Sequence, residues 1–587
     1  MRLFSTFPLL VVIVLGVACA GPEAAHQEVD GTIPEDNRAP PEAESITPPK
    51  RSFTNQVLND LLVAELARQR DRIPLAVSRY LDAAIASRDA GIAEQATRMA
   101  IFAKEQKRAL EAVTLWKEID PDSLDAKRFH AALSIRAGHV KESIPTLQSL
   151  LDDPDIPSDQ GFTLVGGLLG EGDDKEAALA AMEHIIAPYD DDPDAQFAFA
   201  RFLVEIGEKE RAADLFERVI AMGENNPLIR LYYAQFLQDQ GKTAQAMDIL
   251  FDALKNGVED KDLRIGLARL LISEKRYEEA REQFEQLISA DPEAAKIRYI
   301  LALFLLQIEQ EDEARKHFLY LADQGKFMHE AHFNLGRIAE SRKDLQGAMD
   351  LYRQVEDGPH YLDAQIHIAD LLARQKKVRA AREHLHGVSP ESAEESIRLY
   401  RMEGLILIEA DELEEAMSVY GMALGEHPED TELLYDRAML AGRMDRVSIL
   451  EQDLRGLLSQ KPDHVDALNA LGYTLADQTD RHQEAMALIQ RAMALRPNSH
   501  YILDSMGWVL YRLGRHQEAM DYLQRALALR QDAEVAAHLG EVLWVTGDRK
   551  AARDVWNKAI EESPNDERLL KVMRRFGVAS DRKSESE

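Results

Sequence analysis

Apolar and small residues recur along this chain with a period close to 34 residues. The pattern is clearest near the C-terminus, where three rows each place an apolar residue three positions before an apolar–Gly pair. The glycines of these rows are Gly472, Gly507 and Gly540. Alanines follow at fixed offsets, with an aliphatic or aromatic residue between them. Each row therefore predicts two amphipathic helices joined by a turn.

The order of residue sizes explains how the two helices of one row can pack closely. Gly507 on the first helix and Ala519 on the second leave room for the backbones to approach. Leu510 and Leu523 fill the remaining space. A proline such as Pro497 cannot continue a helix interior, so it marks the joint between successive rows.

The same pattern predicts fifteen consecutive units between residues 52 and 572. A chain of 587 residues is too long for one ordinary core, whereas each unit of an array contacts only its neighbours. Two units depart from the pattern, because Ser143 and Leu450 occupy the small position of the second helix, and we expect a distorted joint at Leu450. The positions equivalent to Gly507 are Ala64, Ala100, Ala131, Gly166, Ala200, Ala234, Ala268, Ala302, Gly336, Ala369, Gly404, Ala438, Gly472, Gly507 and Gly540.

This spacing resembles the tetratricopeptide repeat, a helix–turn–helix unit of 34 residues. The resemblance implies an all-α fold, a tetratricopeptide-repeat solenoid that winds as a right-handed superhelix of about fifteen units. It also implies that the first helices line a groove that binds protein.

Residues 1–18 are typical of a lipoprotein signal peptide. Arg2 supplies the positive start, and the apolar run 7–17 is too short to span a bilayer as a stable helix. The run ends in Leu-Gly-Val-Ala before Cys19, the single cysteine of the chain. This resembles a bacterial lipobox, although Gly16 stands where leucine is usual. We expect palmitate-type diacylation of Cys19; the alternative is an ordinary signal with a chance cysteine. In enteric-type sorting, Ala20 favours the outer membrane.

Residues 19–51 are expected to form a lipidated N-terminus and a disordered tether. The segment combines acidic residues with six prolines and has no apolar periodicity, so it cannot build a core. As a flexible coil it spans roughly 30 Å. The polar residues 573–587 are predicted to be a C-terminal tail.

Charge and motifs exclude several classes of function. The net charge of −33 opposes binding to nucleic acid and to anionic lipid headgroups, although it leaves room for a local basic patch. His329 and His332 are one residue short of the zinc-protease spacing, and surface histidines on helices explain them better. We expect no enzyme, no metal, no cofactor and no small-molecule substrate.

Candidate groove residues come from the first helices of the last three units. We call the position equivalent to Gly507 the registering residue of each unit. The candidates lie three positions before, one after and four after the registering glycine. Aromatic residues with a polar end are typical anchors of protein interfaces. The alternative is that Trp508 and Trp544 pack on a neighbouring second helix. The Lys/Asn set with which some arrays clamp a C-terminal carboxylate is absent here. The candidates are Tyr473, Asp504, Trp508, Tyr511, Glu541 and Trp544.

Taken over its full length, the chain resembles the large tetratricopeptide outer-membrane lipoproteins of Gram-negative bacteria of the LbcA type. The segments 64–80 and 471–511 carry the resemblance. It implies a lipid-anchored periplasmic adaptor that gathers a carboxy-terminal processing protease and its substrates, such as cell-wall hydrolases. Two alternatives remain. One is an assembly or secretion scaffold, such as a pilotin or an outer-membrane biogenesis factor. The other is an RNA-binding helical repeat, which the charge and the export signal oppose.

Overall fold

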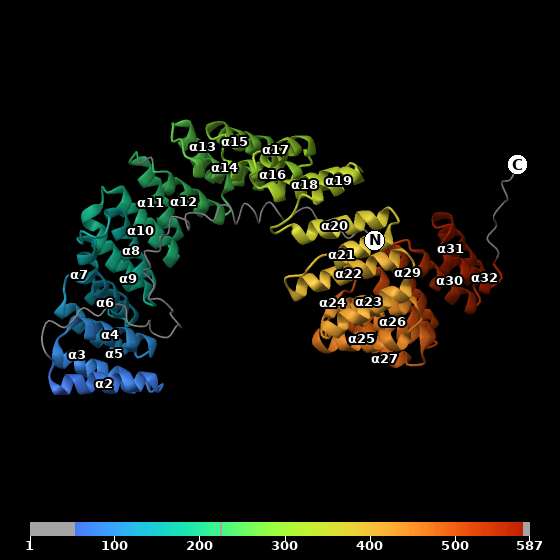
Figure 1. Ribbon diagram of the computed structural model, residues 1–587, viewed down its shortest axis with the longest axis horizontal. Helices are drawn as coiled ribbons and strands as arrows, with labels where there is room; N and C mark the ends of the chain where they lie inside the picture. The colour runs from blue at the N-terminus through green and yellow to red at the C-terminus, as the bar shows by residue number, and fades with distance from the viewer. Residues whose placement is uncertain (1–52, 224–225, 579–587) are drawn as a thin grey trace. The chain divides into compact units, whose positions relative to one another are not determined.

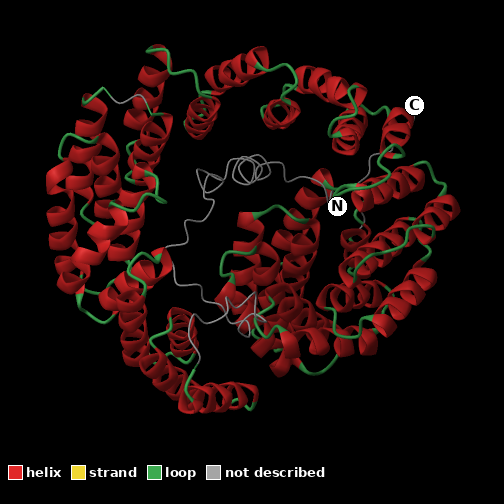
Figure 2. Ribbon diagram, turned by 60° about the vertical axis from the view of Figure 1, so that its left-hand side comes forward, coloured by secondary structure: helices red, strands yellow, loops and turns green. Residues whose placement is uncertain are grey.

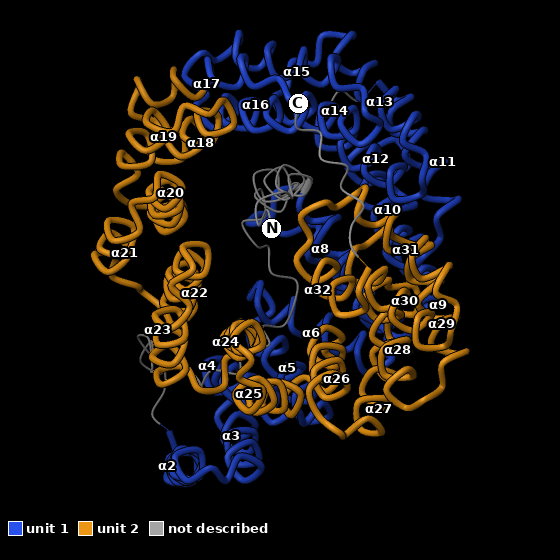
Figure 3. Tube along the Cα trace, turned by 90° about the vertical axis from the view of Figure 1, so that its right-hand side faces the viewer, with its two compact units in different colours: residues 1–317 blue, residues 318–587 orange. Residues whose placement is uncertain are grey.

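A computed structural model of the chain describes residues 53–223 and 226–578. Every regular element in these ranges is a helix, and they contain no strand (Figures 1 and 2). The chain divides into two compact units, residues 1–317 and 318–587, with the boundary inside α17 (Figure 3). The predicted signal peptide, tether and most of the tail lie outside the described residues.

The first unit contains the helices up to α16 and the start of α17, together with the 3₁₀ turn η2. Their bounds are α2 (Asn55–Gln69), α3 (Ile73–Ser87), α4 (Ala90–Phe102), α5 (Gln106–Ile119), α6 (Leu124–Arg136), α7 (Val140–Leu151), α8 (Ser158–Gly170), α9 (Lys175–Ile186), η2 (Ala187–Tyr189), α10 (Pro193–Ile206), α11 (Lys209–Ala221), α12 (Pro227–Asp239), α13 (Thr243–Lys255), α14 (Lys261–Ser273), α15 (Tyr277–Ala290), α16 (Ala295–Gln307) and α17 (Glu311–Asp323).

The second unit contains the remaining helices. Their bounds are α18 (Met328–Ser341), α19 (Leu345–Tyr352), α20 (Tyr361–Arg374), α21 (Val378–His386), α22 (Ala393–Glu409), α23 (Leu413–Glu426), α24 (Thr431–Arg443), α25 (Val447–Gln460), α26 (Val465–Gln478), α27 (His482–Leu495), α28 (His500–Arg512), α29 (His516–Leu529), α30 (Ala533–Val545), α31 (Arg549–Glu562) and α32 (Glu567–Arg575).

Successive helices form fifteen pairs along the chain, from α2 with α3 to α30 with α31, and the two helices pack against each other in every pair but α16–α17, which spans the boundary between the units. We call the even-numbered member of each pair the first helix and the odd-numbered member the second helix. All fifteen registering residues lie on first helices and are buried. The predicted all-α array and its register are therefore confirmed.

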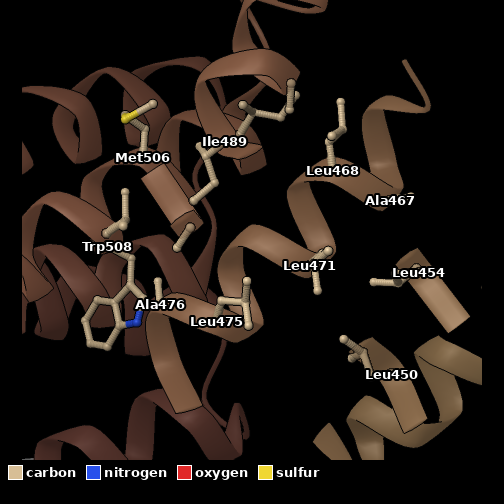
Figure 4. Packing of buried hydrophobic residues seen from close by; sticks show 14 of the residues in the cluster. Leu450, Leu454, Ala467, Leu468, Leu471, Leu475, Ala476, Ile489, Met506 and Trp508 are labelled. Carbon is tan, nitrogen blue, oxygen red and sulfur yellow. The ribbon is translucent and has the colours of Figure 1, made fainter. Parts of the chain in front are cut away.

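Small registering residues make the close contact within each pair. A Cβ atom added to Gly507 would lie 2.5 Å from Cγ of Leu523 and 3.1 Å from the carbonyl oxygen of Ala519. At Gly472 the added atom would lie 2.6 Å from Ile489, so the same pairing recurs one unit earlier. Figure 4 shows Ile489 among the leucines of this core. Interiors this dense have no space for even one further carbon at these positions.

The unit around Leu450 is regular, which differs from the distortion expected there. Leu450 is buried at the small position of α25, and its Cδ1 would lie 2.9 Å from a Cβ atom added to Gly442. Gly442 on α24 thus supplies the space that an alanine on the second helix supplies in other units. At this contact the second helix supplies the large residue and the first helix supplies the small one. The helix pair α24–α25 forms normally.

A final helix, α32, follows the fifteenth pair and packs against α30. It extends to Arg575, and Met573 and Val578 are buried. The folded array therefore continues a few residues beyond the predicted boundary at 572. The apolar positions Leu569 and Met573 are one helical turn apart, so α32 has one side to bury against the last pair.

Candidate protein-binding site

Three first helices, α26, α28 and α30, carry the predicted groove residues of the last three units. These helices contact their first-helix neighbours along the chain, α26 with α28, α28 with α30 and α30 with α32. The six predicted residues fall into three groups, because each group is held by a different set of partners.

His538 on α30 is the centre of the first group, and sequence reasoning did not select it. Its Nδ1 lies 2.9 and 3.1 Å from the two carboxylate oxygens of Asp504 on α28. The ring stacks on Trp508 with centroids 4.2 Å apart, and the hydroxyl of Tyr473 lies 3.4 Å from Nε2. Three of the predicted residues therefore meet around one buried histidine.

The charge of this buried group is set by its neighbours. Burial alone lowers the pKa of His538, but the charge and hydrogen bond of Asp504, with the charges of Glu534 and Glu541, outweigh burial and raise the pKa above its usual value. Burial and the nearby carboxylates also raise the pKa of Tyr473, which stays a neutral phenol. The neighbouring carboxylates therefore favour the protonated form of His538, which lies beside the neutral hydroxyl of Tyr473.

Trp508 presents little surface to a partner, since only 7% of it is exposed. Its indole Nε1 donates to the Asp477 carboxylate at 3.1 Å, and Arg512 donates to the Asp477 carbonyl oxygen at 2.7 Å. The indole packs on the next first helix through His538. Trp508 thus joins two units of the array.

Tyr511 and Glu541 form the second group. The Tyr511 hydroxyl donates to a carboxylate oxygen of Glu541 at 3.2 Å, and Arg575 on α32 pairs with the other oxygen. Burial and the Glu541 charge raise the pKa of Tyr511. Tyr511 remains half-buried, so part of it is open to solvent. It lies on the side of the array formed by the first helices, which we call the first-helix side.

Trp544 forms the third group and is also half-buried. It stacks on Trp556 of the second helix α31 at 5.7 Å and lies 5.8 Å from Phe576. The guanidinium groups of Arg549 and Arg553 lie 5.2 and 5.6 Å from its ring centroid. The structure thus packs this indole against the second helix and still leaves part of it exposed.

Polar contacts at one-repeat spacing link several pairs of successive first helices in the second unit. They join residues 34 or 35 positions apart, the same interval as between Asp504 and His538. This interval was the signal in the sequence that could have identified His538 as a partner of Asp504. The pairs are Arg374–Glu340, Arg398–Asp363, Arg401–Asp436, Tyr501–Asp466, Arg568–Glu534 and Arg575–Glu541.

Of the two histidines flagged by their spacing, His329 has an ordinary backbone partner and His332 is partly buried. Nδ1 of His329 lies 3.1 Å from the carbonyl oxygen of Gln354. Burial and the charge of His329 lower the pKa of His332. Within residues 53–223 and 226–578, no three His, Cys, Asp or Glu side chains are placed to hold a metal ion.

Together these features define a helical-repeat scaffold with a polar and aromatic first-helix side. Two tetratricopeptide-repeat sequence profiles match the chain, one at residues 265–328, 305–361 and 435–500 and the other at 210–270 and 510–576. Over 536 residues the chain is 38% identical to a TPR repeat-containing protein of Pseudomonas aeruginosa, covering 91% of this chain and 90% of that protein.

Two solved structures illustrate the wider similarity. A tetratricopeptide repeat protein of Parabacteroides merdae is 18% identical over 42% of this chain and 97% of its own, with a TM-score of 0.35. A TPR protein of Thermus thermophilus is 24% identical over 32% of this chain and 97% of its own, with a TM-score of 0.28.

The chain belongs to the tetratricopeptide-repeat family. Its repeats make it a scaffold for protein–protein interaction, and such scaffolds usually bind partners without performing chemistry on them. Among the described residues, no helix is both long and apolar enough to cross a bilayer.

Proposed function

We propose that this protein is an adaptor that binds a carboxy-terminal processing protease and its protein substrates and so promotes proteolysis. The observation that carries the proposal is the length of the array, because fifteen helix pairs offer room for two separate partners. The resemblance of segments 64–80 and 471–511 to lipoproteins of the LbcA type supports the choice of partner.

The proposed location is the outer membrane, with the array facing the periplasm. Cys19 would carry the lipid, and residues 20–51 would hold the array away from the bilayer. Confinement of enzyme and substrate on one adaptor raises their effective concentration, which accelerates cleavage without any catalytic group on the adaptor.

Reconstitution tests this function directly. The purified array should cleave nothing alone and should increase the cleavage rate when protease and substrate are added. The rate should pass through an optimum as adaptor is increased and then fall, because separate copies sequester the two partners. A rate that never responds to the adaptor, with no protease bound, would favour the alternative of an envelope assembly or secretion scaffold.

The half-buried aromatic residues Tyr511 and Trp544 are our candidates for direct contact with a partner. Replacing both with alanine should weaken binding of one partner by at least tenfold, since exposed aromatic anchors dominate interface energies. Tyr522 on the second helix α29 is also half-buried and provides the matched control. Tyr522→Ala should bind both partners normally; equal losses in the two variants would remove the first-helix side as the site.

A further inference from the structure

Helix α2, at the N-terminal end of the first unit, is apolar on two sides. One side packs on α3 and is buried, through Val57, Ala64 and Ala67. The other side carries Leu58, Leu62 and Leu66, which are 52, 60 and 40% exposed. These leucines are four residues apart, so they form one stripe along the helix. A helix that is apolar on two sides has a second surface to cover.

The other end of the array shows how a terminal helix is normally finished. α32 buries Leu569 and Met573 and exposes charged residues, among them Arg568, Lys571 and Arg574. Repeat arrays need a polar outer face on their terminal element to stay soluble. On α2, which Figure 1 shows at the N-terminal end of the array, the exposed polar residues Asn55, Asn59 and Gln69 are interrupted by the stripe of exposed leucines.

The local charge around α2 is opposite to that of the chain. Residues 50–79 contain six Lys and Arg against three Asp and Glu, while the whole chain has 70 against 103. Two of the three acids are paired, Asp60 with Arg79 at 3.1 Å and Glu65 with Arg68. Arg70 and Arg72, just after α2, are exposed. An apolar stripe with neighbouring cations is the combination that binds anionic membrane surfaces.

The chain length before α2 brings it close to a bilayer. Cys19 precedes Asn55 by 36 residues, and a flexible coil of that length has an end-to-end distance of roughly 35 Å. The negative charge of the remaining array is screened over about 10 Å in physiological salt, so it opposes the approach of α2 only weakly.

We infer that the exposed side of α2 lies on the lipid surface, with Leu58, Leu62 and Leu66 in the headgroup–acyl boundary and Arg70 and Arg72 near anionic headgroups. This inference deepens the proposed function, because it rests on the membrane anchoring proposed through Cys19. It assigns the membrane as the occupant of the exposed side of α2.

Vesicle flotation tests the inference without the lipid anchor. The chain from Ala20 to Glu587 is mixed with vesicles of 30% phosphatidylglycerol and 70% phosphatidylethanolamine. It should float with them, and the triple variant Leu58→Ser, Leu62→Ser, Leu66→Ser should lower the bound fraction at least fivefold. Arg70→Gln with Arg72→Gln should reduce binding to these vesicles and leave the weaker binding to phosphatidylcholine vesicles unchanged.

A matched control is available on the same chain. Leu495 and Leu529 are 48 and 55% exposed on second helices, and their replacement by serine should leave flotation unchanged. Circular dichroism should show the same helix content in all variants.

Three results would overturn the inference: a wild-type chain that does not float, a triple variant that floats normally, or dimers that the triple variant abolishes without any vesicle binding. None of these would bear on the adaptor assay, which contains no membrane.

Discussion

A registering glycine such as Gly507 permits close helix packing because it has no Cβ atom. Gly507 is buried against Leu523, and an added side chain has no free volume on the facing helix. Gly421 is also within a helix, yet a Cβ atom there would have no neighbour within 4 Å. Glycine therefore has opposite effects at these two positions. At Gly507 it permits close packing, whereas at Gly421 it lowers helix propensity and permits no close contact in return.

Substitution of these two glycines should give effects of opposite sign. Gly507→Leu should lower the free energy of unfolding by about 1–3 kcal/mol, since overpacking forces side chains and backbone to shift. Gly421→Ala should raise it by up to about 1 kcal/mol through helix propensity. Chemical denaturation followed by circular dichroism measures both. Equal stability of Gly507→Leu and the wild type would contradict the packing described for this pair.

Residue sizes at a 34-residue interval were sufficient to predict all fifteen helix pairs, because close helix packing needs a small residue at a fixed place. The same rule failed at Leu450, where the space comes from Gly442 on the opposite helix. For the candidate site, the interval located the first-helix side but could not show that Trp508 would be covered by His538. That contact depends on how closely successive first helices approach, which residue types alone do not specify.

At the level of elements, charged pairs join successive first helices, such as Arg398–Asp363 between α22 and α20 and Arg401–Asp436 between α22 and α24. The pair between Asp504 on α28 and His538 on α30 is the most buried of the first-helix contacts around the candidate site. Removing one member of a buried pair leaves the other charge without compensation, which typically costs about 3–5 kcal/mol. This pair therefore makes the packing of α28 on α30 sensitive to protonation.

The stability of the C-terminal units should fall as pH rises above neutrality. The pKa of His538 is raised in the folded state, so the stabilisation is fully present below the unfolded value of about 6.5 and is lost as pH passes through the folded pKa. Melting temperatures between pH 6 and pH 9 should decrease more in the wild type than in His538→Gln. His139→Gln, which changes an exposed histidine, should retain the wild-type slope. Parallel slopes for wild type and His538→Gln would show that the pair does not titrate in this range.

At the scale of the whole molecule, the proposed anchor and the candidate site lie near opposite ends of the sequence. The N-terminal residues carry the proposed anchor, while the C-terminal units carry the polar and aromatic first-helix side. A lipid at Cys19 would keep the N-terminal end of every copy of the array within a few nanometres of one membrane, given a tether of roughly 30 Å. Partners would then meet on a surface and not in free solution.

Removal of the anchor should release the protein from the membrane. Cys19→Ser should move the chain from the envelope fraction to a soluble or signal-retaining form, because no acyl chain can then be attached. Fractionation with metabolic labelling by a palmitate analogue measures this. Ala20→Ser, which leaves the cysteine in place, is the control and should remain labelled. Label that persists in Cys19→Ser would exclude lipidation at this residue.

The contacts of Tyr473 extend beyond the adjacent unit. Its hydroxyl on α26 meets Glu534 and His538 on α30, past the intervening helix α28. Arrays with coupling only between neighbours can fray one unit at a time, as a one-dimensional Ising chain does. A contact that skips a unit makes three units open together, so their slowest-exchanging amide hydrogens should share one opening free energy. The aromatic first-helix side thus lies on a part of the array where this contact opposes stepwise unravelling.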